Sequence, residues 1–401
     1  MKNMVIAGGG IGGLAAALAC ARAGAEIDVH ERSIEFSEFG AGIQLSPNVV
    51  KILYDWGLQD ALADVAVFPD RLQVRSALSG AQLGVLALGD SICKRYGTPY
   101  LTIHRADMHQ LLLQAVQKQG KVQLHLNSPV LGLNQTDEQL DVKLAAGASL
   151  QAQLLVAADG GWSSLRQQVL DDGKPQPTGH LAYRALLSQA RLPVHLRSTQ
   201  VTAWLGQQQH VIAYPVRRGE LLNVVAIVHG QIQGDLAHWD HSGNAVELQQ
   251  RMQGVSKPLF DLIQAVGSWR LWPLSIRPPM SGAHQHAQGR VAFLGDAAHP
   301  MVPYLAQGAG MAIEDAATLA KVLGQGGAFA SPEENASAVA VPALLQRYAE
   351  QRWRRNARVQ RQAIRNGKIF HAAGPLRWGR DAAMKLLGEG LLDQPWLYAG
   401  A

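Results

Sequence analysis

The chain has 401 residues, of which 47% are hydrophobic and 17% are charged. This length exceeds the size at which a single hydrophobic core stops growing, so we expect two domains. The net charge of +5 comes from basic residues that are dispersed up to the Arg-rich stretch 347–365, a distribution that argues against a nucleic-acid-binding protein.

Only two cysteines occur, Cys20 and Cys93, and no apolar run reaches the length of a membrane span. We therefore expect no disulfide, a reducing compartment such as the cytoplasm, and no membrane-spanning helix. The basic turn 353–355 could contact a membrane or a nucleic acid, but a solvated or subunit-facing surface is the better interpretation. We expect a monomer or a homodimer.

Residues 4–32 predict a dinucleotide-binding unit. Met4–Ala7 is a short apolar run of the kind that forms a buried parallel strand, and a G-x-G-x-x-G turn then opens an Ala- and Leu-rich helix. Gly8 permits the tight turn, Gly10 lets the backbone approach a pyrophosphate, and Gly13 allows close packing of helix against strand. The N–H groups of the helix N-terminus suit phosphate oxygens.

A second strand at 26–30 ends at Glu31. A carboxylate at this distance from the glycine turn can accept hydrogen bonds from the ribose hydroxyls of an adenine dinucleotide. The alternative, a Gly-rich turn that binds nothing, leaves the position of this acid unexplained.

The next segment combines loops, short strands and helices. A helix is expected from Pro47 with Ser46 as its N-cap, and residues 72–88 are typical of two strands joined by a turn. Arg105 begins a helix that runs to about Gln119. An arginine at a helix N-terminus opposes the helix dipole unless it meets an anion, and a pyrophosphate would be such an anion.

Strands at 122–126, 130–133 and 140–144 predict a small meander, and a buried strand follows at 154–158. Asp159 comes directly after that strand, where ligands bind in open α/β sheets. A role in capping the turn is the alternative for Asp159.

Residues 183–228 are richer in β-forming residues. Strands are expected at 201–205, 211–216 and 221–228, which predicts a second, largely antiparallel sheet. Helices at 245–253 and 258–266 are expected to cover it.

The chain then returns to the nucleotide-binding domain. A buried strand from Arg290 ends at Asp296, and a helix beginning near Gly308 runs to Leu323. A Gly/Ala/Ser-rich linker follows. A long helix at 342–368 and a shorter helix after Pro375 complete the chain.

These elements predict an α/β fold with a discontinuous Rossmann-like domain, an inserted sheet domain for the substrate and a C-terminal helical segment. The Rossmann-like domain would comprise residues 1–72, 97–180 and 270–323. The mostly antiparallel sheet domain would comprise residues 73–96 and 181–269, and the C-terminal helices residues 340–401.

Three motifs carry a resemblance to a known family: Met4–Arg32, Asp159-Gly160 and Gly295-Asp296-Ala297-Ala298-His299-Pro300. In this order and spacing the chain resembles the single-component FAD-dependent aromatic hydroxylases, typified by para-hydroxybenzoate hydroxylase. It looks closest to the salicylate, 3-hydroxybenzoate and 6-hydroxynicotinate hydroxylases. The resemblance implies bound FAD and transient NADH or NADPH. It also implies that O2 hydroxylates a small electron-rich aromatic, a phenolic acid or a hydroxypyridine, through a flavin hydroperoxide.

The resemblance also implies which residues bind FAD. The expected cofactor-binding residues are Gly8, Gly10, Ile11, Gly13, Glu31, Arg32, Gln44, Arg105, Asp159, Asp296, Gly308, Ala309 and Gly310. Arg105 would contact the pyrophosphate, Asp296 the ribityl and phosphate region, and Asp159 both FAD and the nicotinamide cofactor. The helix from Gly308 would direct its N-terminal N–H groups at the N1–C2 edge of the flavin.

Three departures from the family pattern limit what can be carried over. Residues 306–310 read AQGAG where many relatives have Gly-Gln-Gly-x-Asn. Pro303 replaces a glutamine of some 3-hydroxybenzoate hydroxylases, and Gln44 replaces a histidine of the 6-hydroxynicotinate enzymes. Neither substrate can therefore be assigned.

The strand at 211–216 carries the candidate catalytic residues. His210 and Tyr214 share one face of it, and Pro215 is expected to end the ladder. The resemblance implies that His210 is the base that deprotonates the substrate and that Tyr214 orients the ring. In the alternative, His210 lies at an exposed strand start and Tyr214 belongs to the core.

Two further residues complete the expected site: Pro303 at the catalytic centre and Arg184, which would attract an acidic substituent. No metal site is expected, because His284 and His286 form an isolated pair. Two other functions are left open, an FAD-dependent reductase or oxidase of the same fold and a non-catalytic dinucleotide-binding protein.

Overall fold

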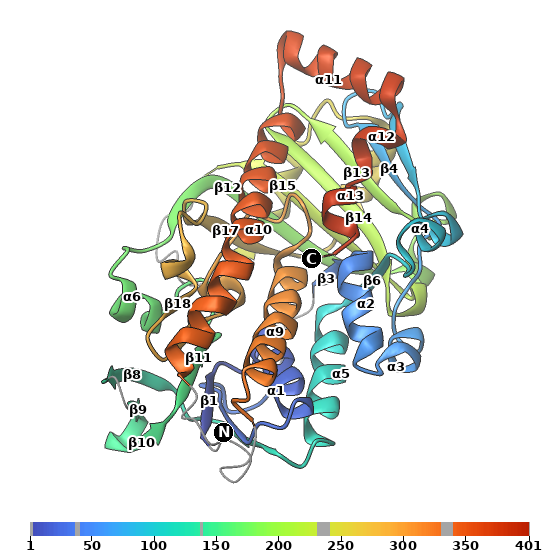
Figure 1. The fold of residues 1–401 in the computed structure, drawn as a ribbon. Coiled ribbons are helices and arrows are strands. Elements are labelled where there is room, and N and C mark those ends of the chain that lie inside the picture. Colours follow the sequence, from blue (N-terminus) through green and yellow to red (C-terminus); the bar gives the residue numbers. More distant parts are fainter. Residues whose placement is uncertain (1–2, 37–40, 137–138, 231–240, 330–339, 401) are drawn as a thin grey trace. The chain divides into compact units, whose positions relative to one another are not determined.

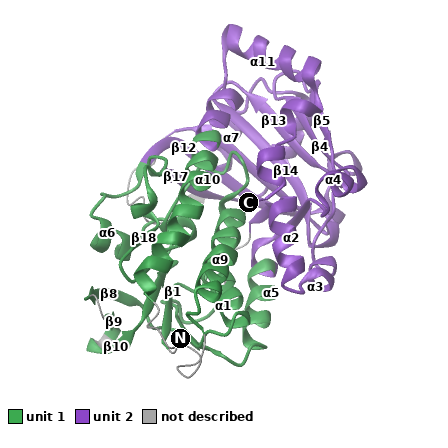
Figure 2. Cartoon of the chain, in the orientation of Figure 1, with its two compact units in different colours: residues 1–38, 108–176, 276–362 green, residues 39–107, 177–275, 363–401 purple. Residues whose placement is uncertain are grey.

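A computed structural model of the chain describes residues 3–36, 41–136, 139–230, 241–329 and 340–400. The chain divides into two compact units, shown in Figure 2. Unit 1 comprises residues 1–38, 108–176 and 276–362, and unit 2 comprises residues 39–107, 177–275 and 363–401.

These units divide the chain at residues other than the expected domain boundaries. All of residues 39–107 belong to unit 2, whereas most of them were expected in the nucleotide-binding domain. The reason is local pairing, since β3 (Gly42–Leu45) pairs with β6 (Leu101–His104) and the Thr102 hydroxyl donates to the Pro215 carbonyl at 2.5 Å.

Unit 1 is built on a six-stranded sheet in the order β18-β19-β11-β1-β2-β7. The strands are β1 (Met4–Ala7), β2 (Ile27–His30), β7 (Val122–His125), β11 (Leu154–Ala157), β18 (Ala287–Gln288) and β19 (Val291–Phe293). All pairs are parallel except β18 with β19. The prediction that Val122–His125 belongs to the meander is wrong, because this strand pairs in parallel with β2 at the sheet edge.

The two faces of this sheet pack against different partners. Val5 and Ala7 contact the meander of β8 (Val130–Gln135), β9 (Leu140–Leu144) and β10 (Ser149–Ala152). Ile6 points the other way, toward Gly13 on α1. The alternation follows from the two-residue period of a strand, so a run that is apolar throughout can be buried on both faces.

The helices of unit 1 are α1 (Ile11–Arg22), α6 (Ser164–Leu170), α9 (Gly308–Gln325) and most of α5 (Arg105–Gln117) and α10 (Val341–Phe370). Helices α1 and α9 lie side by side (Figure 1). A Cβ on Gly12 would lie only 2.9 Å from Leu294 Cδ2 and 3.4 Å from Ala312 Cβ. Small residues therefore set the distance between these helices.

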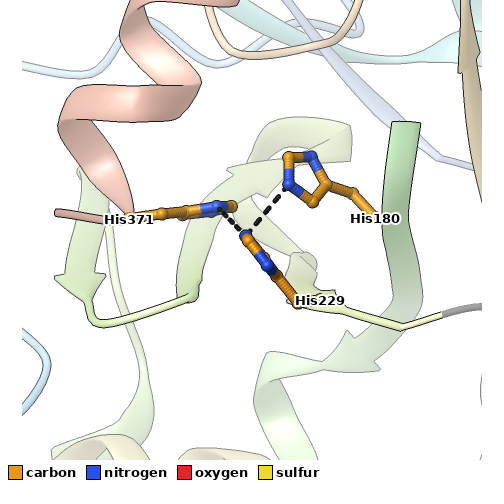
Figure 3. A group of neighbouring side chains, drawn as sticks. All are labelled: His180, His229 and His371. Carbon is orange, nitrogen blue, oxygen red and sulfur yellow. Dashed lines mark hydrogen bonds between the residues drawn. The ribbon is translucent and has the colours of Figure 1, made fainter. Parts of the chain in front are cut away.

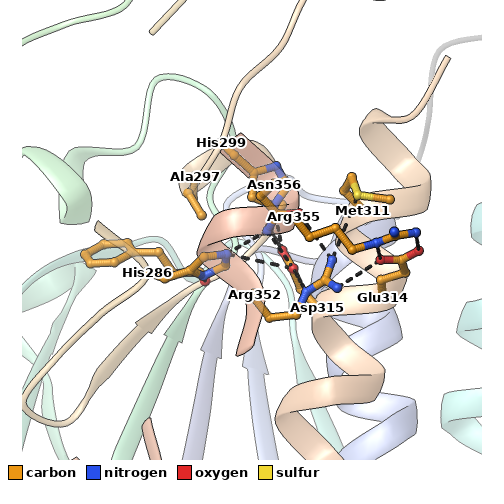
Figure 4. A network of polar contacts seen from close by, with 12 residues as sticks. His286, Ala297, His299, Met311, Glu314, Asp315, Arg352, Arg355 and Asn356 are labelled. Atoms are coloured by element: carbon orange, nitrogen blue, oxygen red, sulfur yellow. Dashed lines mark hydrogen bonds and ion pairs between the residues drawn. The ribbon is translucent and has the colours of Figure 1, made fainter. Parts of the chain in front are cut away.

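A buried polar network anchors α9 through Asp315 (Figure 4). The Asp315 carboxylate accepts hydrogen bonds from Arg352 Nε at 2.7 Å, Asn356 Nδ2 at 2.9 Å and the Gly295 backbone N–H at 3.3 Å. Its other contact is His299 Nε2 at 2.6 Å. Burial by itself raises the pKa of Asp315, but His299 and Arg352 outweigh burial and hold the pKa below its usual range.

His286 extends this network as a neutral side chain. Its Nδ1–H donates to the Phe293 carbonyl at 2.9 Å, and its Nε2 accepts from Asn356 Nδ2 at 2.7 Å. Burial lowers the pKa of His286 to about 4, and the opposing effect of Asp315 does not overcome it. A protonated Nε2 could no longer accept the hydrogen bond from Asn356 Nδ2, and its proton would lie against the protons of that amide.

Unit 2 is built on an eight-stranded sheet in the order β16-β17-β12-β15-β14-β13-β4-β5. The strands are β4 (Arg71–Ser76), β5 (Gln82–Ala87), β12 (Gln176–Ser188), β13 (Val201–Gly206), β14 (Gln209–Val216), β15 (Leu221–His229), β16 (His241–Gly243) and β17 (Trp269–Ile276). The expected antiparallel character is confirmed for β12 to β15, and β13 pairs with β4 in parallel.

The two faces of this sheet differ in polarity. Helices α7 (Ala245–Arg251) and α8 (Lys257–Gln264) pack on the face that carries Tyr183, Val211 and Val224. Because strand residues alternate, residues 180, 182 and 184 of β12, 210, 212 and 214 of β14, and 223 and 229 of β15 lie on the opposite face. We call this the polar face.

The remaining helices of unit 2 are short. They are α2 (Pro47–Asp55), α3 (Gln59–Ala63), α4 (Gly89–Tyr96), α11 (Gly374–Leu387), α12 (Glu389–Leu392) and α13 (Pro395–Tyr398). Met384 and Leu392, from α11 and α12, pack on β4, β5 and β13. Among the described residues, no helix is both long and apolar enough to cross a membrane.

The prediction that Pro215 ends the ladder is wrong. Strand β14 continues to Val216, with Pro215 opposite Leu222 of β15. Proline is tolerated here because the pairing of β14 with β13 stops at Ala213, so the missing N–H is not needed on that side.

We predict that unit 1 loses stability in mild acid through His286. The pKa of His286 is about 4 in the folded chain and about 6.5 in an unfolded chain. Between these values the unfolded state binds more protons, so the free energy of unfolding falls by about 3 kcal/mol as the pH falls from 6.5 to 4. Chemical denaturation across this range should show a shallower slope for His286→Gln. The exposed residue His195 supplies the control, His195→Gln, and an equal slope in both variants would contradict the prediction.

Candidate cofactor and substrate site

The glycine turn of unit 1 has a backbone that only glycine can supply. Gly8 has φ +108°, and a Cβ there would collide with the Ala158 carbonyl. A Cβ on Gly13 would collide with the carbonyl oxygen of Gly8. The G-x-G-x-x-G pattern therefore reflects two close backbone contacts between β1, β11 and α1.

The N-terminus of α1 is open to an anion. Its N-cap is Gly10, no side chain caps the first turn, and the first turn contains no acidic residue. The N–H groups that precede Leu14, whose own N–H donates to the Gly10 carbonyl at 2.9 Å, are therefore available to phosphate oxygens. His109 Nε2 lies 2.7 Å from the Gly9 carbonyl and fixes the turn from the side of α5.

Glu31 lies at the end of β2, as predicted. Its carboxylate accepts hydrogen bonds from the Gly9 N–H at 2.6 Å and the Ser33 N–H at 2.9 Å. A carboxylate held between the glycine turn and the strand end has the position that adenosine ribose hydroxyls need. The adjacent Arg32 is exposed.

Asp159 follows β11 and presents an unsatisfied atom. Its Oδ1 is buried and has no hydrogen-bond partner among the described residues. Burial raises the pKa of Asp159, and hydrogen bonds from the Ser163 hydroxyl and the backbone of Leu165 and Ser164 oppose this rise. A buried carboxylate oxygen without a donor is costly, so a donor on a bound ligand would stabilise it.

The N-terminus of α9 is a second site with free N–H groups. Its N-cap is Gln307, no side chain caps the first turn, and the first turn contains no acid. The side-chain-poor residues Gly308, Ala309 and Gly310 begin the helix. A Cβ on Gly308 would lie 4.0 Å from Asp296 Oδ1, so the Asp296 carboxylate lies beside this helix end.

Ala306 stands where many relatives have glycine, and its backbone conformation shows what this departure costs. It adopts φ +53°, a left-handed conformation that favours glycine, and its N–H donates to the Pro303 carbonyl at 3.1 Å. Holding alanine there costs about 1–2 kcal/mol relative to an ordinary conformation. The turn before α9 therefore keeps its shape at an energetic cost.

A polar cluster in unit 2 surrounds Tyr214. Its hydroxyl is hydrogen-bonded to Gln44, and Gln44 Oε1 accepts from the Tyr100 hydroxyl at 2.6 Å. The backbone N–H of Gly42 donates to Asn223 Oδ1 at 2.8 Å, and a Cβ on Gly42 would lie 2.5 Å from Tyr214 Cε2. Strand β3 thus holds Tyr214 by direct contact.

Arg184 lies on the polar face near this cluster. Its guanidinium stacks 4.7 Å from the centre of the Trp272 ring, and it forms no ion pair with any described residue. Burial lowers the pKa of Arg184, Tyr214 opposes the shift, and Arg105 adds to it. A guanidinium in this setting would be stabilised by an anion.

His210 is buried, with only 1% of its surface exposed, so the alternative of an exposed strand start is wrong. Its Nδ1 lies 2.7 Å from His371 Nε2, and its ring packs against Phe370. Burial, with smaller contributions from His371 and His180, holds the pKa of His210 well below 6.5. His210 is therefore neutral at pH 7, as a base must be.

The expected site residues fall into both units. Unit 1 contains the glycine turn, Glu31, Arg32, Asp159, Asp296, Pro303 and the start of α9, and unit 2 contains Gln44, Arg105, Arg184, His210 and Tyr214. Sequence reasoning missed Tyr100, Asn223, Trp272 and His371, which contact the expected residues. No local motif marks them, because Asn223 and Trp272 are placed by strand pairing, Tyr100 by the start of β6 and His371 by the end of α10.

Comparison with known proteins decides the family. The sequence pattern of a family described as "FAD binding domain" matches residues 2–363. The chain belongs to this family. The orphaned Asp159 oxygen, the glycine turn and the two open helix N-termini of unit 1 fit the cofactor for which the family is described.

Relatives match at least nine-tenths of the chain. The chain is 35% identical over 377 residues to 3-hydroxybenzoate 6-hydroxylase 1 of Aquipseudomonas alcaligenes, covering 93% of this chain and 91% of the relative. It is 34% identical to 6-hydroxynicotinate 3-monooxygenase of Bordetella bronchiseptica, covering 90% of each. A solved salicylate hydroxylase substrate complex matches with TM-score 0.81 and 26% identity, covering 99% of this chain and 95% of that chain.

These findings confirm the resemblance and the α/β fold. The protein is an FAD-dependent aromatic monooxygenase, with NADH or NADPH as its co-substrate. The two alternative functions, a reductase or oxidase and a non-catalytic binding protein, are set aside.

We predict that Asp159→Asn weakens FAD retention and slows flavin reduction by NADH or NADPH. The amide keeps the size of the side chain but removes the charge that a ligand donor would meet, at a cost of about 1–3 kcal/mol. Flavin content after dialysis and stopped-flow reduction measure both effects.

Asn244→Ala is the control for the capping alternative, because the Asn244 side chain caps α7 in unit 2 by accepting from the Val246 N–H at 3.0 Å and the Glu247 N–H at 3.2 Å. This variant should lose about 1 kcal/mol of stability and keep normal flavin reduction. If Asp159→Asn likewise changes only stability, Asp159 is a capping residue.

Proposed function

We propose that this monooxygenase hydroxylates the ring of a small phenolic acid or hydroxypyridine with one oxygen atom of O2. The relatives act on 3-hydroxybenzoate and 6-hydroxynicotinate according to their names. The observation that carries the proposal within this chain is Arg184, a cation without an ion-pair partner among the described residues, beside Tyr214 and over Trp272. A carboxylate on the substrate would complete it.

The chemistry requires an electron-rich ring. Reduced FAD with O2 supplies an electrophilic oxygen atom, and the protein contributes binding, orientation and proton transfer. A phenol attacks an electrophile far better once its hydroxyl is deprotonated, so a base must lie near that hydroxyl. A site that excludes water also prevents loss of the oxygen as hydrogen peroxide.

His210 is the proposed base. In the tautomer with its proton on Nδ1, this nitrogen donates to His371 Nε2 at 2.7 Å, and Nε2 carries the lone pair of a base. The same contact orients the ring. Tyr214 and Arg184 lie on the same polar face and would hold the ring and its acidic substituent.

The other assignments belong to the same proposal. Glu31 would bind the adenosine ribose, Arg105 the pyrophosphate, and the start of α9 the flavin edge, where its N–H groups favour negative charge. Pro303, in the turn before α9, would contact the substrate ring. Gln44 is hydrogen-bonded to Tyr100 and Tyr214. These bonds support a role for Gln44 in positioning Tyr214, in addition to its expected role in binding the cofactor. The proposed location is the cytoplasm, and a monomer or homodimer remains the expected state.

We predict that Arg184→Met raises KM for hydroxybenzoates but not for the matching phenols that lack the carboxylate. Loss of a charge-assisted hydrogen bond of about 1.5–3 kcal/mol corresponds to roughly 10–150-fold. A panel of hydroxybenzoates, hydroxypyridines and simple phenols, scored by NADH and NADPH oxidation and by incorporation of labelled oxygen, measures it. The exposed residue Arg191 provides the control Arg191→Met. An unchanged KM for the hydroxybenzoates in Arg184→Met would contradict a contact between Arg184 and the substrate carboxylate.

We predict that His210→Ala uncouples the enzyme. Product formation should fall by about 10²–10⁴-fold, while FAD content stays normal and NADH oxidation continues with release of hydrogen peroxide. His210→Gln, which fills more of the space, should show the same loss if proton transfer is the cause. Coupled turnover at the parent rate in either variant would exclude His210 as the base.

A further inference from the structure

A cluster of histidines lies on the polar face where β15 ends, and none of its members is assigned to FAD (Figure 3). His180 on β12 and His229 at the end of β15 are directly opposite each other in the antiparallel pair, so their side chains share one face. His371 follows α10. Two backbone hydrogen bonds link His371 to His229 through Gln208: the Gln208 N–H donates to the His371 carbonyl at 3.3 Å, and the His229 N–H donates to the Gln208 carbonyl at 3.1 Å.

Three ring nitrogens converge in this cluster. His229 Nε2 lies 3.0 Å from His180 Nε2 and 3.1 Å from His371 Nδ1, and all three nitrogens lie within 4.8 Å of one another. Tetrahedral zinc with Zn–N bonds of about 2.0–2.1 Å places its ligand nitrogens roughly 3.3 Å apart. The two separations from His229 Nε2 are close to that value, and the remaining pair, His180 with His371, lies within 4.8 Å.

Hydrogen bonding alone serves this arrangement poorly. A neutral imidazole nitrogen either donates one proton or offers one lone pair, so His229 Nε2 can form one good hydrogen bond but faces two nitrogens. A divalent cation satisfies all three nitrogens at once, because each directs its lone pair at the metal.

We propose that His180, His229 and His371 form a site for a divalent transition-metal ion such as Zn²⁺. Three histidine ligands with an open fourth position are a known zinc arrangement, and neutral imidazole also suits Cu²⁺ and Ni²⁺. The site lies partly at the surface, since His229 is exposed and His371 is 8% exposed, so an ion can enter from solvent.

The protonation states support the proposal. Burial and the neighbouring histidines lower the pKa of His371 to about 3 and the pKa of His180 to about 4, and burial lowers the pKa of His229. All three imidazoles therefore carry their lone pairs at pH 7, as metal ligands must.

His371 also has the outer contact that metal ligands usually have. Its second nitrogen, Nε2, lies 2.7 Å from His210 Nδ1. Such a contact fixes the tautomer and ring orientation of a ligand.

The charged side chains near the cluster do not attract a cation. Arg380 contributes to the low pKa of His371, and Arg251 NH1 donates to the His229 carbonyl while it pairs with Glu247. The affinity must therefore come from the three imidazoles. The other histidine group, His286, His299 and Asp315, is different, because Arg352 already places a cation 2.7 Å from Asp315.

The test is metal binding by the untagged, flavin-loaded protein after removal of metals with a chelator. Titration with ZnCl₂, followed by calorimetry, should show one saturable site per chain, and CoCl₂ should give the visible absorption of tetrahedral nitrogen coordination. Zn²⁺ should also raise Tm, because it binds the folded chain.

His229→Gln and His180→Gln should each lose saturable binding, the cobalt spectrum and the Tm shift, while their Tm without metal stays near that of the parent. His195→Gln, an exposed histidine of the same unit, should bind as the parent does. No saturable binding by the parent, undiminished binding by both ligand variants, or equal loss in His195→Gln would overturn the proposal. Flavin content and hydroxylation are measured separately. Absence of metal binding would therefore not contradict the role of His210 as the base, which the His210 variants test.

Discussion

The close approach of backbone to backbone at the glycine turn is the constraint on which unit 1 depends. Gly8 lies against the Ala158 carbonyl and Gly13 against the Gly8 carbonyl, so neither position accepts a Cβ. This packing brings the N-terminus of α1 to the carboxyl ends of β1 and β11. Glu31 and the orphaned oxygen of Asp159 are placed at the same edge of the sheet by parallel pairing. The open N-terminus of α1 and the placement of the polar side chains therefore share one cause.

A second constraint anchors α9. Asp315 is buried among His299, Arg352, Asn356 and the Gly295 N–H. Removing one partner from such a network strongly destabilises the folded chain, because it leaves a buried charge uncompensated. It ties α9 to the turn after β19 and to α10. The strained Ala306 lies one residue before the N-cap of α9, and its N–H donates to the Pro303 carbonyl within the same turn.

The polar face of unit 2 carries one network of histidines to which we assign two proposed roles. In its proposed role as a base, His210 keeps its proton on Nδ1 and donates to His371 Nε2. A metal ion on His371 Nδ1 instead leaves the His371 proton on Nε2, which then donates to His210 Nδ1 and moves the His210 proton to Nε2. The two states require opposite tautomers of His210, so an ion at the cluster would compete with proton abstraction.

Local patterns of strand, turn and helix were enough to predict the fold class, the glycine turn, the positions of Glu31 and Asp159 after their strands, and the helix at Gly308. The sequence pattern misplaced Val122–His125, since the alternating apolar and polar residues of a four-residue strand do not reveal which strand it pairs with. It also gave no sign of His371 beside His229, which are 142 residues apart, or of Gly42 against Tyr214. Strand register and helix ends bring such residues together, and only the tertiary structure decides these contacts, because they depend on pairing between segments that are distant in the chain.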